Sequence, residues 1–122
     1  MLKYIVTLLM FLPAHTHAKT LVCEFPKYHS QDETRLQTAS GFEMTFRYDL
    51  ITREAFMEGN AGISSVVLKV GYDGLTFLEF LPSGAVQSTT VAKNGAAVHS
   101  RHTLMIGDLL LPSQYYGSCK GY

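Results

Sequence analysis

The feature that most constrains the fold is a series of turn-forming pairs at nearly even spacing: Asp73-Gly74, Ser83-Gly84 and Asn94-Gly95. Glycine tolerates positive φ, and Asn or Asp before it tolerates the left-handed region, so such pairs form the tight turns between antiparallel strands. The runs between them are rich in residues that favour strands. The segment from Ile63 to Met105 is therefore predicted to be a β-meander.

A second stretch has the pattern of a strand with one buried face. Apolar side chains at Phe42, Met44, Phe46 and Tyr48 alternate with polar or charged ones up to Asp49. A period of two over eight residues indicates a strand whose other face meets water. With 47% hydrophobic and 16% charged residues in 122, the chain is too apolar for disorder and has the size of one domain.

The two cysteines of the chain, Cys23 and Cys119, stand near its opposite ends. In an exported protein such a pair indicates a structural disulfide, which here would tie the first strand to the last. Closing so long a loop restricts the unfolded chain by about 4–5 kcal/mol in the entropy model. The fold class is therefore predicted as all-β, an antiparallel meander closing into a small up-and-down barrel or sandwich of about seven to eight strands.

Residues 1–18 have the three parts of an export signal. Lys3 is the charged start, Tyr4 to Leu12 is the apolar run, and small or polar residues follow up to Ala18, after which we expect cleavage. The apolar run is shorter than the roughly 20 residues that span a bilayer, so no membrane anchor is expected. The prediction is a signal peptide followed by a single domain at 19–122, in the periplasm or outside the cell.

The charge balance excludes one class of partner. Ten basic and ten acidic side chains give no net charge, and loss of Lys3 with the leader leaves about −1. Without a basic stripe to neutralise phosphates, nucleic acid is not expected as a partner.

Prolines mark the expected ends of the first and last strands. Thr20 to Phe25 alternates as a first strand, which Pro26 is predicted to end because proline gives no N–H to a ladder. The polar stretch 27–40 is interpreted as a long loop. After a strand at Leu109 to Leu111, Pro112 is predicted to open a closing segment.

The stretch His99-Ser100-Arg101-His102 is the densest group of residues able to do chemistry. On a strand, residues three apart point to opposite faces, so His99 and His102 do not both reach one metal ion, and no metal or other cofactor is predicted. We expect His102 to be the core histidine and His99 and Arg101 to be at the surface. A hydrolase that uses Ser100, a histidine and Glu79 is the enzymatic alternative.

The binding-site prediction joins this stretch to the tyrosines near the end of the chain. Arginine holds anionic groups through forked hydrogen bonds, and tyrosine is common at binding surfaces. A site for an unknown protein or a small anionic ligand is therefore predicted from five residues: His99, Arg101, Gln114, Tyr115 and Tyr116.

In size and compartment the chain resembles small exported bacterial β-barrels, including the disulfide-tied inhibitors of lysozyme. Those inhibitors present a Ser-Gly loop that ends in Tyr, whereas Ser40-Gly41 is followed here by Phe42, so no inhibitory residue carries over. The leading prediction is a small exported binding or interaction module without catalysis. The alternatives are the hydrolase and a structural component of the cell envelope.

Overall fold

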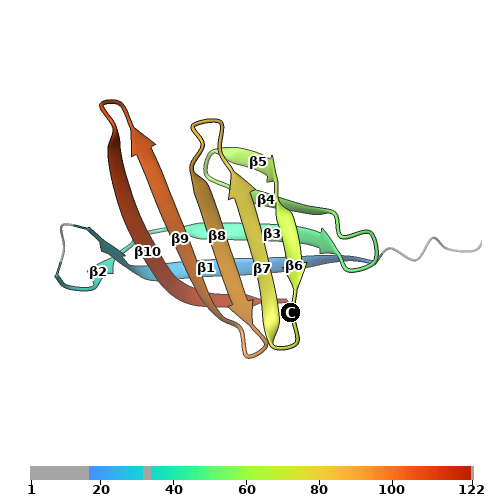
Figure 1. Cartoon of the computed structure of the whole chain (residues 1–122). Helices are drawn as coiled ribbons and strands as arrows, with labels where there is room; N and C mark the ends of the chain where they lie inside the picture. The colour runs from blue at the N-terminus through green and yellow to red at the C-terminus, as the bar shows by residue number, and fades with distance from the viewer. Residues whose placement is uncertain (1–16, 32–33, 122) are drawn as a thin grey trace, which may run out of the picture.

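The computed structural model describes residues 17–31 and 34–121, which form ten antiparallel strands in one sheet and no helix (Figure 1). No helix of this part is therefore available to span a membrane. The strands are β1 (Ala18–Ser30), β2 (Gln37–Thr38), β3 (Glu43–Asp49), β4 (Ala55–Gly59), β5 (Gly62–Ser65), β6 (Val67–Val70), β7 (Gly74–Phe80), β8 (Val86–Ala92), β9 (Ala96–Met105) and β10 (Leu109–Lys120).

The sheet is a meander that returns to its start. Its order is β5-β4-β3-β1-β10-β9-β8-β7-β6, with the short β2 beside β1. Only Val66 separates β5 from β6, and its N–H donates to the carbonyl oxygen of Ala55 at 3.1 Å. One bent stretch thus pairs with β4 through its first half and with β7 through its second half. The result is a nearly closed barrel, which confirms the predicted all-β antiparallel class with more strands than expected.

The three predicted turns are confirmed as the β6–β7, β7–β8 and β8–β9 connections. Gly84 and Gly95 have φ values of 94° and 91°, a region that glycine enters without steric cost. Gly74 has a different role, because it begins β7 and a Cβ there would overlap the backbone carbonyl of Val91. Its hydrogen side chain lets β7 and β8 approach each other.

The predicted disulfide is also confirmed. Cys23 and Cys119 are directly opposite each other in the β1–β10 ladder, with Cα atoms 4.0 Å apart, and their sulfur atoms are bonded. Both side chains are buried. The bond therefore fastens the first strand to the last inside the core, and it is typical of proteins from oxidising compartments.

The core lies between two parts of the sheet that cross steeply in Figure 1, β1 with β3 behind and β7 to β10 in front. Phe46 of β3 and Phe77 of β7 stack across this space with ring centroids 4.1 Å apart. The alternation predicted for β3 is confirmed, since Met44, Phe46 and Tyr48 are buried.

Neither proline ends its strand, which corrects two expectations. Strand β1 runs through Pro26 to Ser30, and its register shifts between Glu24 and Lys27. A proline fits such a bulge because the bulged residue gives no N–H to the ladder. Part of the predicted loop 27–40 is therefore strand. Pro112 likewise lies within β10, opposite His102.

The predicted export signal lies almost entirely in residues 1–16, outside the described part of the chain, so its cleavage stays a prediction. Strand β1 begins at Ala18, at the expected cleavage site.

Gly117 of β10 lies where the bulge of β1 presses on the neighbouring strand. A Cβ at this position would overlap the carbonyl group of Glu24 and approach the Cα of Phe25 at 2.8 Å. These neighbours are backbone atoms next to the disulfide-bonded pair, so they cannot move aside without disturbing the β1–β10 ladder. The bulge therefore requires glycine at this point of β10.

We predict that Gly117→Ala lowers the free energy of unfolding by at least about 2 kcal/mol, because overpacked sites cost about 1–3 kcal/mol and here the obstacle is backbone. Gly59→Ala is the matched control, since its Cβ would meet only the flexible Met57 side chain at 3.4 Å. Urea denaturation of the oxidised proteins measures both. Equal losses in the two variants would contradict the close approach at Gly117.

Candidate functional site

One end of the barrel carries a row of polar side chains that face its interior. The ladders place Glu79 of β7, Gln87 of β8, Arg101 of β9 and Ser113 of β10 side by side. All four are half-buried. We call this end the mouth and these four residues the mouth row.

A cavity of about 430 Å³ opens at the mouth. Glu79, Gln87 and Arg101 line one wall of the cavity. The other wall is formed by Phe42, just before β3, Met44 of β3 and Met57 of β4, with the β4–β5 turn at the rim. Pockets for small molecules have this size and this mixture of apolar walls with a few polar groups.

Directly beneath the mouth row lies a layer that holds the buried histidine. His99 is 1% exposed, its Nδ1 is 2.7 Å from the hydroxyl of Thr89, and its Nε2 accepts a hydrogen bond from Arg101 Nε at 3.2 Å. An arginine only donates, so Nε2 carries no proton and Nδ1–H donates to Thr89. His99 is therefore a neutral imidazole in one defined tautomer.

The surroundings of His99 keep it neutral. Its ring lies among the rings of Phe25, Phe42 and Tyr115 at centroid distances of 5.8, 5.6 and 6.0 Å. Burial, and then the positive charge of Arg101, lower the pKa of His99 from 6.5 to about 4. Both causes act against the charged form.

Arg101 is held in place by aromatic rings, and no carboxylate of the described residues forms a salt bridge with it. Its guanidinium carbon lies 4.7 Å from the ring centre of Phe42 and 5.1 Å from that of Tyr115, both favourable cation–π contacts. Within 17–31 and 34–121, the salt bridge is between Arg47 and Glu58 at 3.6 Å. The charge of Arg101 thus faces the cavity without a carboxylate partner from the described residues.

The five predicted site residues divide between the two faces of the sheet. His99, Arg101 and Tyr115 gather inside the mouth. Gln114 and Tyr116 lie on the outer face, in a chain of hydrogen bonds: Tyr116 Oη donates to Gln114 Oε1 at 2.8 Å, Gln114 Nε2 donates to Ser100 Oγ at 3.1 Å, and His29 Nδ1 is 3.5 Å from Tyr116 Oη.

The two histidines of β9 exchange their expected places. His99 is the buried one and His102 is exposed, because the inward positions of β9 are odd-numbered. Ser100 is paired with Gln114 and faces away from His99, so the described contacts do not assemble the serine–histidine pair of the hydrolase alternative. No group of three or more His, Cys, Asp or Glu side chains in the described ranges is arranged to hold a metal ion.

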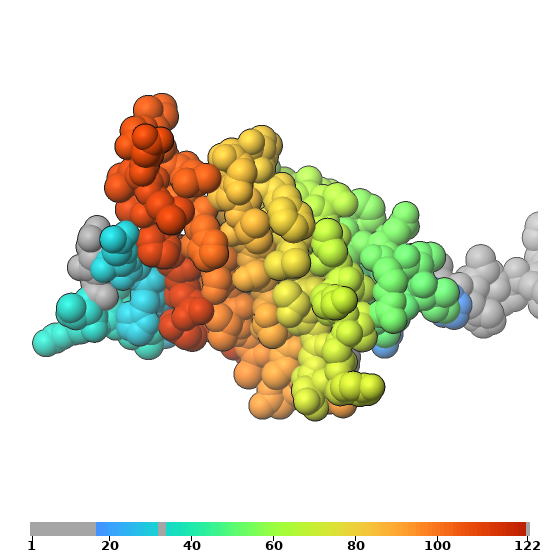
Figure 2. Space-filling model, viewed as in Figure 1, coloured from blue at the N-terminus to red at the C-terminus, as the bar shows by residue number. Residues whose placement is uncertain are grey.

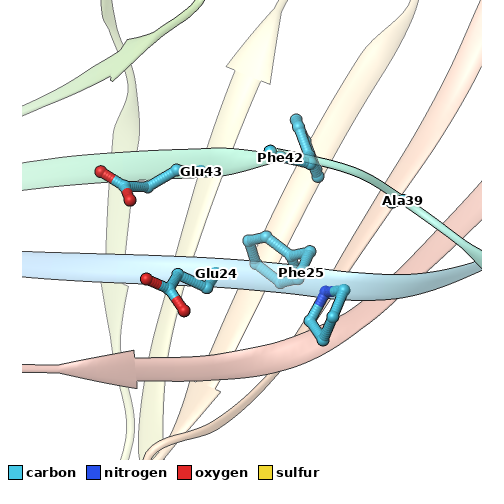
Figure 3. A pocket seen from close by; sticks show the side chains of 7 residues that line it. Glu24, Phe25, Ala39, Phe42 and Glu43 are labelled. Atoms are coloured by element: carbon cyan, nitrogen blue, oxygen red, sulfur yellow. The ribbon is translucent and has the colours of Figure 1, made fainter.

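A second hollow, of about 180 Å³, lies where β1 turns away from β3 after its bulge. Figure 3 shows Glu24 and Glu43 side by side on these two strands, next to Phe25 and Phe42. The glutamates are direct cross-strand partners, and like charges in that position repel each other. This hollow offers no fixed cation, in contrast to the mouth.

Sequence reasoning missed the partners that complete the mouth. Gln87 and Thr89 belong to a polar run that is typical of a solvated strand face, but Thr89 is 2% exposed and bonded to His99. Phe42 was recognised as strand, without its contact to Arg101. The signal for this site is the register of four strands, which no single strand reveals.

Comparison with models of known protein families, with curated proteins and with solved structures finds no match.

We predict that His99 makes the protein less stable in mild acid. The pKa of His99 is lower in the folded chain than the usual 6.5. Between pH 6.5 and pH 4 the unfolded chain therefore binds a proton on this histidine that the folded chain does not bind. The free energy of unfolding is at its full value above pH 6.5 and falls as the pH drops toward 4. Between pH 7.5 and 5 the expected loss is about 2 kcal/mol.

Urea denaturation at both pH values measures this loss, with His99→Gln as the test and His102→Gln as the control. The His102 variant should keep the dependence on pH of the wild type, because that side chain is exposed. The His99 variant should lose most of it, whatever its stability at pH 7.5. The same slope in all three proteins would show that His99 titrates normally.

Proposed function

We propose that this protein is a small exported binding barrel, periplasmic or secreted, that holds an anionic small molecule at its mouth without catalysis. The observation that carries the proposal is Arg101: a half-buried guanidinium, fixed by two aromatic rings and His99, that faces a cavity of about 430 Å³ with no carboxylate partner among the described residues.

The energetics favour an anion at this position. A charge that is partly withdrawn from water is costly unless it is paired and hydrogen-bonded. Nε of Arg101 is already used on His99, which leaves the terminal N–H groups of the guanidinium for a ligand. A carboxylate or phosphate accepts such groups in pairs. The ligand would therefore supply the acceptors that the described protein groups do not.

The rest of the mouth row limits the size of the charged group. Glu79 stands two strands from Arg101, with Gln87 between them, which is about 10 Å at the usual spacing of strands. A second negative group near Glu79 would be repelled. The site thus favours a ligand with one compact anionic group close to Arg101 and hydrogen-bonding groups toward Gln87.

His99 serves this site as a positioning residue. Both ring nitrogens have partners, Thr89 on one side and Arg101 on the other. A histidine in this arrangement has no free nitrogen to take a proton from a substrate. Its role is to fix the direction of the guanidinium, which supports binding and not acid–base chemistry.

We predict that benzoate binds at the mouth and that its neutral isostere benzamide binds at least ten-fold more weakly at pH 7.5. The difference follows from the charge-assisted hydrogen bonds, which contribute about 1.5–3 kcal/mol. Isothermal titration calorimetry gives the affinities, and shifts of amide signals from β8 and β9 in two-dimensional NMR locate the ligand.

Arg101→Gln should reduce the affinity for benzoate to that for benzamide. Arg47→Gln is the matched control, because Arg47 is an exposed arginine already paired with Glu58, and it should bind benzoate as the wild type does. Equal binding of benzoate and benzamide by the wild type would refute the proposal even if the Arg101 variant failed to fold.

A further inference from the structure

The hairpin between β9 and β10 extends beyond the rest of the barrel as a two-stranded arm. The pairing of β9 with β8 stops at Arg101, and the pairing of β10 with β1 stops at Ser113. Among the described residues, 102–112 therefore have only each other as ladder partners. Figure 1 shows the arm projecting at the top left, and Figure 2 shows a notch between its tip and the β7–β8 turn.

The arm exposes more apolar surface than its own folding explains. Ile106 at the tip is fully exposed, and four neighbouring side chains are about half exposed: Leu104, Met105, Leu109 and Leu110. A two-stranded ribbon without a covering layer gains little from apolar residues. Such exposed apolar groups mark a surface that meets another molecule.

The two faces of the arm differ in their relation to the mouth. Alternation puts Thr103 and Met105 of β9 on the same face as Arg101, and puts Leu111 and Leu109 of β10 on the same face as Ser113. This inner face continues the wall of the cavity outward. The outer face carries the register pairs Leu104 with Leu110 and His102 with Pro112.

No strand of the described part of the chain pairs with either edge of the arm, because the pairing of β8 stops at Gln87, opposite Arg101, and that of β1 stops at Ser30, opposite Ser113. Open sheet edges do not occur in the hydrocarbon region of a bilayer, where their N–H and C=O groups would lack partners. Deep insertion of the arm into a membrane is therefore disfavoured. A ligand that lies along one face leaves both edges in water.

We propose, building on the proposed function, that the ligand is a single-chain anionic amphiphile whose head binds Arg101 and whose alkyl chain lies along the inner face of the arm. The chain cannot run deeper into the barrel. Below the mouth the core is filled by the stacked rings of Phe46 and Phe77, and the remaining void of about 10 Å³ is no larger than a water molecule needs.

The arm fits this role in length and in chemistry. From Arg101 to Met105 the wall extends about 13 Å at the usual rise of a strand. Its inward side chains beyond the mouth row are a threonine, a methionine and two leucines, which carry no charge to oppose an alkyl chain. Methionine adapts its shape to different chains. The head is thus recognised by charge and the chain by apolar contact.

The test is the dependence of affinity on chain length, measured by calorimetry with butanoate, hexanoate, octanoate and decanoate below their micellar concentrations. Contact along one face buries about half of each methylene, so affinity should rise about two-fold for each one added. Decanoate, with six more methylenes, should then bind roughly 60-fold more tightly than butanoate. Decyltrimethylammonium, with a similar chain and a cationic head, should not compete with decanoate.

Two double variants compare the faces of the arm. Met105→Asn with Leu109→Asn changes a register pair on the inner face, and Leu104→Asn with Leu110→Asn changes the adjacent pair on the outer face. The inner variant should bind butanoate normally but lose most of the gain with chain length. The outer variant should keep that gain. All four side chains are exposed, so the fold should tolerate both changes.

The outcomes separate this inference from the function on which it rests. If butanoate binds but longer chains gain nothing, or if both double variants lose the gain equally, the amphiphile is wrong while an anion site at Arg101 stands. If no carboxylate binds, both proposals fail. The protein can also be sedimented with phosphatidylcholine vesicles. If it sediments with them and either double variant abolishes this, the arm binds a membrane surface and the proposal of a bound amphiphile is wrong.

Discussion

The pairing of β1 with β10 is the constraint on which the rest of the structure depends. It joins the two ends of a long meander, a contact of high sequence separation that costs loop entropy to form. Three local features fix its register. The Cys23–Cys119 bond lies at one end, Gly117 fits against the bulge in the middle, and Tyr28 stacks on Tyr115 with centroids 5.3 Å apart at the mouth. Because β9 follows β10 in the sheet, this register also sets the depth of Arg101.

The site combines groups that would each be costly in an apolar interior. A buried histidine and a half-buried arginine would both lose hydration, and like charges would repel if the imidazole were protonated. The low pKa of His99 avoids that repulsion, and the aromatic rings of Phe42 and Tyr115 give the remaining charge a favourable surface. Within residues 17–31 and 34–121, no salt bridge supplies an acceptor for the outer edge of the guanidinium.

The fold was predictable where its signals are local. The turn pairs, the alternation in β3 and the presence of only two cysteines sufficed for an antiparallel meander with a closing disulfide. The inner face of β9 was predicted wrongly. Val98 and Leu104 favour an apolar face at the even-numbered positions, whereas the side chains that point inward are those of Ala97, His99 and Arg101. The partners of His99 and Arg101 are Thr89 and the aromatic rings of Phe42 and Tyr115, which come from other parts of the chain. These contacts are tertiary, so the pattern of residues along β9 does not predict them.

The expectation that a proline ends a strand holds for a regular ladder. At Pro26 the strand is irregular, and the bulge removes the need for the missing N–H. The binding site was also predicted only in part, because its residues depend on the register between strands. Arg101 and Tyr115 stood out by type, but strand alternation separates them from Gln114 and Tyr116, and that separation depends on a register that the sequence alone does not state.

The register of β1 and β10 gives the barrel a polarity along its length. Val22 lies opposite Lys120, so the β1–β10 pairing ends beyond the disulfide, seven residues from Ser113 of the mouth row along β10. A tether, tag or neighbouring domain joined to the end of β10 would sit at that pole and leave the opening facing outward. Immobilising the protein through the Lys120 end of β10 therefore presents the cavity to the solution.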